Sequence, residues 1–207
     1  SPNDGPTHHG LFDLSYLRCI PNAVVMQPRD ENELREMLFT SVFANRPCFI
    51  RYPRGHGTGV DLSPQPKSLE IGHAQIITKG NDGAIWALGN FVEDAIWLSE
   101  TLKEKFDLDC TVVNARFVKP LDEKLLVQHA KEHQFIISME DNVLNGGFGS
   151  AMLEKLQENN ISIPFKRIGW PDKFIPHGDS VSSLREKFGL SRIGILEQTQ
   201  LFLNQSQ

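Results

Sequence analysis

The 207-residue sequence has no apolar run of about 18 residues, the length that a transmembrane helix requires. Its first residues lack the basic-then-apolar pattern of a secretory signal. Only three cysteines are present, Cys19, Cys48 and Cys110, and they show neither close pairing nor the spacing of a zinc site. We therefore interpret them as reduced thiols in or near the core of a cytoplasmic protein.

An excess of positive charge is also missing. The formal net charge of −5 disfavours nucleic acid and anionic membrane surfaces as partners, because the overall field would not attract them. Hydrophobic residues make up 40% of the chain and charged residues 23%, which is ordinary for a globular protein that can bury a core. The sequence contains neither an internal repeat nor a low-complexity segment.

The first part of the chain alternates between helical and strand patterns. Apolar residues recur at helical spacing over 12–20 and 31–43, and short apolar runs at 23–26 and 47–53 predict buried strands. Asp30 and Glu33 have the spacing of a capping box at the start of the second helix. The resulting strand–helix–strand unit predicts a right-handed parallel crossover.

After residue 68 the alternation begins again. The expected strands are 73–79, 84–89, 110–113, 135–140 and 163–168, and the expected helices are 92–106, 121–133, 150–159, 181–188 and 192–203. This order predicts an α/β fold with a doubly wound, mostly parallel sheet that has 73–79 at an edge. In such sheets ligands bind beyond the carboxyl ends of the strands.

Residues 4–13 carry the densest chemistry, with two carboxylates and two histidines in one stretch. Their glycines and proline favour a turn over a regular element. A histidine beside a carboxylate can move protons near neutral pH. Spacing alone is equally consistent with a polar surface loop that opens a domain.

Three further motifs have two interpretations each. Arg51 and Arg54 directly follow a strand, so they either clamp a phosphate or carboxylate or serve as solvated or ion-paired arginines. The glycine-rich turn 146–150 could hold a phosphate at a helix N-terminus, but it lacks the Walker lysine, and a tight, closely packed turn is favoured. Residues 140–142 either bind a metal ion or a hydroxyl group or cap the next helix.

Histidine and tryptophan complete the candidates. His129 and His133 have the spacing of metal ligands on a helix, yet no third ligand is evident, so a solvated helix face is favoured. Trp86, Trp97 and Trp170 are expected in the core or at an interface.

Several of these segments resemble one family in register. Residues 4–13, 17–22, 28–38, 51–55, 114–122, 145–150 and 169–178 are similar to the 1-deoxy-D-xylulose-5-phosphate synthases, thiamine-diphosphate enzymes related to transketolase. The combination distinguishes this family from transketolase proper and from pyruvate dehydrogenase beta subunits. Leu11 stands where a smaller residue is common, and Trp170 stands where leucine is expected.

The resemblance implies a transferase that decarboxylates pyruvate and joins the two-carbon unit to glyceraldehyde 3-phosphate. The product is a precursor of isoprenoids, thiamine and pyridoxal. The resemblance also implies thiamine diphosphate and Mg²⁺ as cofactors of the full enzyme, and a cytoplasmic homodimer.

The resemblance covers only part of such an enzyme. It implies the C-terminal half of a pyrimidine-binding domain (1–56), a linker (57–68) and a transketolase C-terminal domain (69–207). The family's Gly-Asp-Gly motif for magnesium and diphosphate is absent, as is the glutamate that activates the aminopyrimidine. We therefore expect this chain to be the back part of a longer protein, to bind no cofactor alone and to be inactive alone.

Three site residues carry over at matching motif positions. His8 resembles the histidine that handles the carboxylate of pyruvate and the protons of the intermediate. Asp4 resembles the acid that orients the substrate hydroxyl or carbonyl, and Arg54 resembles the arginine that binds the phosphate of the aldehyde. No metal ligand or cofactor-binding residue carries over. Three neighbours are expected either to be structural or to contact the site residues without touching the substrate: His9, Asp13 and Arg51.

Two alternatives to an enzyme portion stay open. One is a catalytically inactive assembly or dimerisation fragment that lacks the diphosphate- and magnesium-binding domain. The other is one half of a split enzyme whose N-terminal half is a separate polypeptide.

Overall fold

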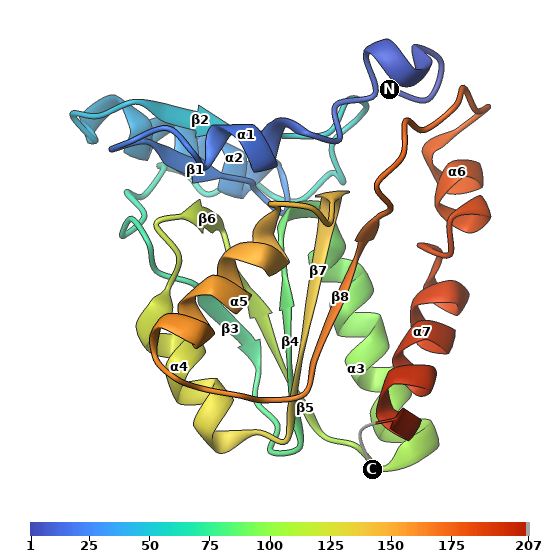
Figure 1. Cartoon of the computed structure of the whole chain (residues 1–207). Coiled ribbons are helices and arrows are strands. Elements are labelled where there is room, and N and C mark those ends of the chain that lie inside the picture. Colours follow the sequence, from blue (N-terminus) through green and yellow to red (C-terminus); the bar gives the residue numbers. More distant parts are fainter. Residues whose placement is uncertain (206–207) are drawn as a thin grey trace.

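The computed structural model describes residues 1–205, which form two sheets, one above the other in Figure 1. The upper layer (residues 1–56 with strand β6) contains a three-stranded sheet of order β2-β1-β6. The lower unit contains a five-stranded sheet of order β3-β5-β4-β7-β8 and most of the helices. The N-terminus lies at the upper layer, and the C-terminal helix runs down the lower unit (Figure 1).

The upper layer follows the predicted strand–helix–strand pattern. Its elements are η1 (Gly5–Thr7), α1 (Asp13–Leu17), β1 (Val24–Met26), α2 (Glu31–Phe43) and β2 (Cys48–Ile50). β1 and β2 pair in parallel, as predicted. The Asp30 side chain accepts the N–H of Glu33 at 2.8 Å, whereas the Glu33 carboxylate accepts the N–H of Arg29 and not that of Asp30. The expected capping box is therefore only half formed.

Strand β6 (Phe117–Lys119) was not among the predicted elements. It pairs antiparallel with β1, although it lies more than 90 residues further along the chain. Lys119 fixes this position, because its Nζ donates to the carbonyl oxygens of Arg18 (2.9 Å) and Ile20 (2.7 Å). A strand of three residues is too short to show a period in sequence, which explains the omission.

The lower unit confirms the predicted doubly wound, mostly parallel sheet. Its strands are β3 (Gln75–Thr78), β4 (Gly83–Ala87), β5 (Cys110–Asn114), β7 (Phe135–Val143) and β8 (Phe165–Trp170). Its helices are η2 (Gly89–Phe91), α3 (Val92–Phe106), α4 (Glu123–Glu132), α5 (Phe148–Glu158), α6 (Val181–Lys187) and α7 (Arg192–Gln205). β3 lies at an edge, as predicted, and is the one strand of this sheet that pairs antiparallel.

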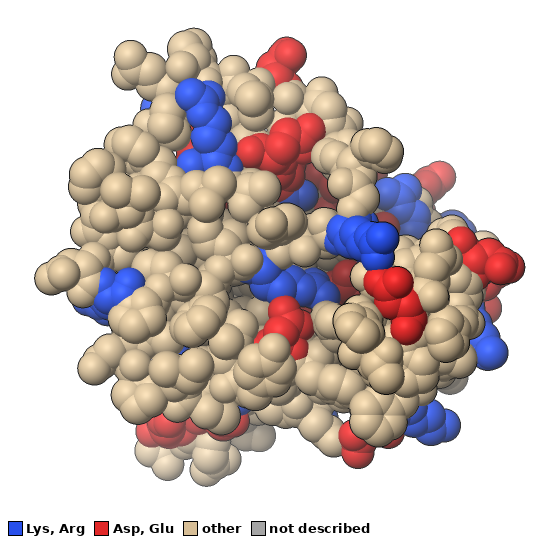
Figure 2. All heavy atoms as spheres, turned by 90° about the horizontal axis from the view of Figure 1, so that it is seen from above, with Lys and Arg blue, Asp and Glu red and all other residues tan. Residues whose placement is uncertain are grey.

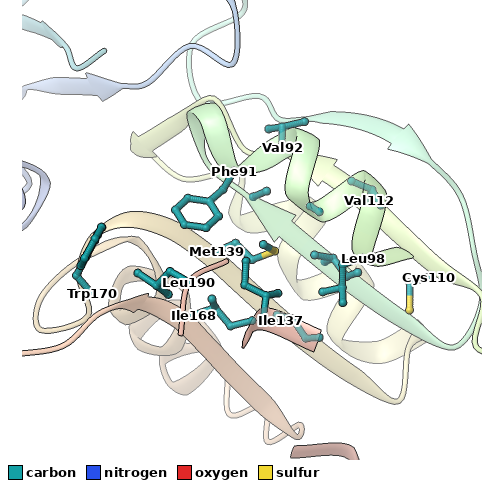
Figure 3. Packing of buried hydrophobic residues seen from close by; sticks show 14 of the residues in the cluster. Phe91, Val92, Leu98, Cys110, Val112, Ile137, Met139, Ile168, Trp170 and Leu190 are labelled. Carbon is teal, nitrogen blue, oxygen red and sulfur yellow. The ribbon is translucent and has the colours of Figure 1, made fainter. Parts of the chain in front are cut away.

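Successive side chains of the buried strands enter two separate cores. Ile85 and Ala87 of β4 pack in the core under α3 and α7, which Figure 3 shows with Leu98, Met139 and Ile168. Ala84 and Trp86 of the same strand pack in the core under α4 and α5. Both faces of the sheet are therefore covered, which is why its strands are continuously apolar in sequence.

β7 is longer than expected and reaches the upper layer. Its pairing with β4 ends at Met139, but the strand continues through residues 140–143. All of these residues are buried, and Val143 donates its N–H to the carbonyl oxygen of Leu11 at 2.8 Å. This extension brings the lower unit against the segment 4–13.

The expectation of a solvated face for His129 is wrong. His129 is buried, and its Nδ1 accepts a hydrogen bond from Trp86 Nε1 at 3.2 Å. Burial lowers the pKa of His129 to about 4, so the ring stays neutral at pH 7. His133 lies beside it and bonds to the Thr111 hydroxyl. His129 faces inward because the buried indole N–H of Trp86 needs a hydrogen-bond acceptor inside the core.

Cysteine burial is more varied than expected. Cys110 is buried, and burial raises the pKa of its thiol to about 12. Cys48 is partly buried, but Cys19 is exposed, which corrects the expectation that it lies in or near the core. Helix α1 ends at Leu17, before the predicted end at residue 20.

Within residues 1–205 no helix combines the length and the apolar character needed to cross a lipid bilayer.

Candidate functional site

A cavity of about 360 Å³ lies where the upper layer meets the lower unit. Its walls come from the segment 8–13, from residues 50–54 after β2, and from the lower unit, including Asn90, Asp141 and Trp170. Figure 2, which views the molecule from the upper layer, shows acidic and basic side chains next to one another on this face. The cavity lies beyond the carboxyl ends of β2, β7 and β8, as expected for an α/β sheet.

His8 lines this cavity directly after the 3₁₀ turn of η1. The Thr7 hydroxyl lies 2.8 Å from His8 Nδ1, which leaves Nε2 available to a ligand. The turn is held from the lower unit, because the His177 ring packs so closely on Gly5 that a Cβ there would lie 2.4 Å from it. Gly5 also has a φ of +64°, so only glycine fits this position without strain.

Arg54 and Asp4 form an ion pair at the mouth of the cavity. Arg54 Nη1 lies 2.5 Å from Asp4 Oδ2 and 3.4 Å from the Ser1 hydroxyl. The Arg54 side chain is 69% exposed, so much of its guanidinium faces solvent. The structure thus places His8 and Arg54 on one cavity, while Asp4 contacts Arg54 from outside the cavity lining.

Arg51 has a different environment from Arg54. Its side chain is only 11% exposed, and Nη2 donates to the carbonyl oxygens of Gly10 (2.9 Å) and Asp141 (2.8 Å). Nε lies 3.5 Å from Asp13 Oδ2. Of the two interpretations, the ion-paired one therefore holds for Arg51.

Asp141 belongs to the segment 140–142 that the sequence offered as a metal or hydroxyl site or a helix cap, and it lines the cavity as a partner of Arg51, which the sequence did not predict. Burial opposes its charge, but Arg51 and Arg185 hold the pKa of this carboxyl below its ordinary value. Trp170 Nε1 also donates to Asp141 Oδ1 at 2.6 Å. No sequence signal links Asp141 to Arg51, because their contact spans 90 residues.

His9 also lines the cavity and has aromatic neighbours. Its ring centroid is 5.0 Å from that of Phe12 and 6.4 Å from that of Phe174. Burial lowers the pKa of His9, so the ring is neutral at pH 7. Both ring nitrogens are buried, and neither has a hydrogen-bond partner within the described residues.

The glycine-rich turn holds a carboxylate of the protein itself. Glu140 accepts the N–H groups of Phe148 (2.7 Å) and Gly149 (2.9 Å) at the start of α5. A Cβ at Gly147 would lie 2.1 Å from Glu140 Oε2, which explains the glycine there. The structure thus supports the close-packing interpretation of the turn and the capping interpretation of residues 140–142.

Glu140 makes the stability of the fold depend on pH. Burial raises its pKa from 4.5 to about 7, against the opposing effect of the two N–H donors. The folded state therefore binds this proton more tightly than the unfolded chain does, so the stabilisation is complete below pH 4.5 and is lost as pH rises to about 7. Relative to Glu140→Gln, we expect the free energy of unfolding of the wild-type chain to fall by about 3 kcal/mol across this range.

Urea unfolding of both proteins at several pH values measures this difference. The glutamine variant keeps the size of the side chain and one acceptor oxygen but cannot titrate, so only the pH slope is compared. Parallel slopes for the two proteins would contradict the assignment of the titration to Glu140.

The chemistry of the side chains does not fit a magnesium site. Within the described part of the chain no three His, Cys, Asp or Glu side chains are placed to hold a metal ion. The cavity instead presents the imidazoles of His8 and His9, an exposed and a buried guanidinium group, and the carboxylates of Asp13 and Asp141. These groups suit a polar, anionic organic ligand.

Comparisons with known proteins agree with the motifs. The family model "Transketolase, pyrimidine binding domain" matches residues 2–58, and "Transketolase, C-terminal domain" matches residues 72–195. The chain is 48% identical over 199 residues to a 1-deoxy-D-xylulose-5-phosphate synthase of Methylacidiphilum infernorum, covering 96% of this chain and 31% of that protein. The enzyme of the same name from Syntrophus aciditrophicus is 48% identical over 202 residues, covering 97% and 31%. The chain therefore spans about a third of the length of these curated relatives.

Solved structures share the fold. A structure described as "Split gene transketolase, inactive beta4 tetramer" superposes with a TM-score of 0.86 at 29% identity, covering 98% of this chain and 65% of that one. Transketolase from Campylobacter jejuni gives a TM-score of 0.67 at 18% identity, covering 96% of this chain and 29% of that one, a likeness of fold alone. Because the C-terminal domain model alone matches more than half of its residues, the chain belongs to the transketolase family, and the resemblance inferred from its motifs is confirmed.

Proposed function

We propose that this chain is the C-terminal part of a thiamine-diphosphate-dependent 1-deoxy-D-xylulose-5-phosphate synthase. The observation that carries the proposal is the 48% identity over 96% of the chain to an enzyme of that name. The full enzyme would decarboxylate pyruvate and transfer the two-carbon unit to glyceraldehyde 3-phosphate. It would act as a cytoplasmic homodimer. In this proposal the chain divides at the boundaries 1–56, 57–68 and 69–207, of which residues 206–207 lie outside the described residues.

Arg54 is the residue that binds the phosphate of the aldehyde. Asp4 engages only its Nη1, so the rest of the exposed guanidinium is open to an anion at the cavity mouth. A planar guanidinium can donate two parallel hydrogen bonds to phosphate oxygens. Asp4 remains beside the same site, where its carboxylate accepts a hydrogen bond from the substrate hydroxyl.

His8 carries the proton transfers. Thr7 engages Nδ1, so Nε2 is the nitrogen that gives or takes a proton. An imidazole suits this role because its ordinary pKa is near neutral. The carboxylate of pyruvate would enter the same cavity and lie against His8.

The cofactor supplies the carbanion chemistry when it is bound. The described residues do not form a site for its magnesium ion, so we assign no cofactor step to them. Thiamine diphosphate and Mg²⁺ would be held by the rest of the enzyme, because this chain corresponds to only 31% of its relative's length. On its own, the chain would bind neither and would be inactive.

A second candidate is one polypeptide of a split enzyme. It is favoured by the split-gene transketolase structure, whose fold covers 98% of this chain. The tetramer in that structure is described as inactive, which also fits a role in assembly without catalysis. Both catalytic candidates share one fold and predict product on mixing with an N-terminal portion, so activity distinguishes them from a role in assembly without catalysis.

The test is product formation from pyruvate and glyceraldehyde 3-phosphate with thiamine diphosphate and Mg²⁺. The chain is assayed alone, and then with a separately produced N-terminal portion of the relative from Methylacidiphilum infernorum. Product only on mixing supports the proposal. Product from the chain alone would contradict the account of its missing cofactor site, and no product from either sample would favour the inactive assembly fragment.

A further inference from the structure

We propose that Arg51 and Asp141 form a positioning pair through which the lower unit fixes the loop that carries Asp4 and His8. This inference rests on the proposed function, because it assigns the pair a role in orienting those two residues. Neither member of the pair is placed to react. Arg51 is 11% exposed, and Asp141 is buried in the cavity floor.

Arg51 is anchored at the end of β2. Its backbone N–H donates to the carbonyl oxygen of Met26 at 2.9 Å, which extends the pairing of the upper sheet by one residue. From this fixed base its side chain reaches Gly10, two residues after His8, and donates to the Gly10 carbonyl oxygen at 2.9 Å. The same nitrogen donates to the backbone oxygen of Asp141, so one guanidinium holds the loop and the lower sheet together.

The side chain of Asp141 is fixed by further residues of the lower unit. Trp170 Nε1 donates to Oδ1 at 2.6 Å, and Asn90 Nδ2 donates to Oδ2 at 3.2 Å. Arg185 of α6 lies 3.4 Å from Oδ2, and Arg51 Nη1 lies 3.8 Å from the same oxygen. A carboxylate with this many fixed partners cannot rotate freely, so it places a fixed negative charge beside Arg51, whose hydrogen bond to Asp141 goes to the backbone oxygen.

Before His8 the loop is held by the packing of His177 on Gly5 and by the ion pair between Asp4 and Arg54. Its backbone contacts the lower unit through the Val143 N–H to Leu11 oxygen bond and the Gly178 N–H to Pro2 oxygen bond. His8 lies between these two points and is exposed. Arg51 is therefore the side chain that limits movement of Gly10 and, through it, of His8.

The alternative is that Arg51 only braces the upper layer against the lower unit. Arg18 provides the matched control for that case. It also reaches from the upper layer to the lower unit, donates to a backbone oxygen (Gly146, 3.0 Å), pairs with Glu154 and is 17% exposed. Arg18 does not line the cavity, so its loss removes a brace without releasing the loop.

The experiment compares the wild-type chain with Arg51→Met, Asp141→Asn and Arg18→Met. Hydrogen–deuterium exchange of the peptide covering residues 4–12 is measured in the full chain at matched global stability. We expect Arg51→Met to speed this exchange at least about tenfold and Arg18→Met to leave it unchanged. Asp141→Asn should speed it less than Arg51→Met, because it removes the charge beside Arg51 but keeps the backbone oxygen that accepts from Arg51. If Arg51→Met does not fold, Arg51→Lys replaces it. Lysine keeps the positive charge but lacks the guanidinium that bonds to Gly10 and Asp141 together.

The same variants are then assayed with the N-terminal portion described above. We expect kcat to fall about 10²-fold for Arg51→Met, with the KM for the aldehyde changed much less and partial recovery in Arg51→Lys. Equal exchange in the Arg51 and Arg18 variants would overturn the positioning role. An Arg51 variant with faster exchange of residues 4–12 but an unchanged kcat would overturn it as well. If the wild-type mixture makes no product, the proposed function fails, while the exchange data still decide whether the pair orders the loop.

Discussion

Replacing His8 by Ala is expected to lower kcat about 10²–10⁴-fold in an assembly that makes product, with little change in the KM for glyceraldehyde 3-phosphate. His8 lines the cavity with Nε2 free, whereas the aldehyde phosphate is assigned to Arg54. Loss of the imidazole therefore removes a proton carrier but not the main binding contact. Steady-state kinetics with both substrates varied measures the two constants separately.

A matched control is His73→Ala. His73 is also exposed and pairs with Glu70 at 3.0 Å, but it does not line the cavity, so its replacement should leave both constants unchanged. His8→Gln should remain as slow as His8→Ala, because an amide fills the space without carrying protons near pH 7. Full turnover by either His8 variant would remove this residue from the proton transfers.

Replacing Arg54 by Ala is expected to raise the KM for glyceraldehyde 3-phosphate about 10²-fold. The change removes a charge-assisted donor that can bind phosphate with two hydrogen bonds. Arg54→Lys should have an intermediate KM, because it keeps the charge but loses the planar arrangement of donors. The KM for unphosphorylated glyceraldehyde should not respond to either substitution.

Arg46→Ala is the control for a general loss of positive charge on the upper layer. Arg46 is exposed and does not line the cavity, so its KM values should match those of the wild-type assembly. An unchanged KM for the phosphorylated aldehyde in Arg54→Ala would exclude Arg54 as the phosphate-binding residue. An equal rise for both aldehydes would instead indicate a disturbed cavity.

Much of the fold follows from local pattern. The alternation of short apolar runs with helical periods predicted the mostly parallel sheet and the edge strand β3. Among the features that escaped it, two depend on contacts between residues far apart in the chain. β6 is held by pairing with β1 and by hydrogen bonds from Lys119 to carbonyl groups about 100 residues earlier in the chain. His129 is buried beside Trp86, whose indole N–H it accepts across 43 residues of sequence.

The candidate site, too, could be predicted from the sequence only in part. The loop of residues 4–13 could be recognised from its composition, and its resemblance to a known family suggested roles for Asp4 and His8. The contact of Arg51 with Asp141 could not be predicted from the sequence, because it depends on how far β7 extends past its pairing with β4. The glycine-rich turn had two interpretations until the structure placed the Glu140 carboxylate on its N–H groups.

The central claim is that this chain supplies residues of the active site and does not only assist assembly. The most direct measurement is a titration of the chain into a fixed amount of the N-terminal portion, first with wild-type chain and then with a mixture of wild-type and His8→Ala chains. We expect product formation to rise to a plateau at one chain per N-terminal portion, and the His8→Ala chain to lower that plateau in proportion to its share. A plateau that does not change when half of the chains carry His8→Ala, or product formed without any chain, would contradict the claim.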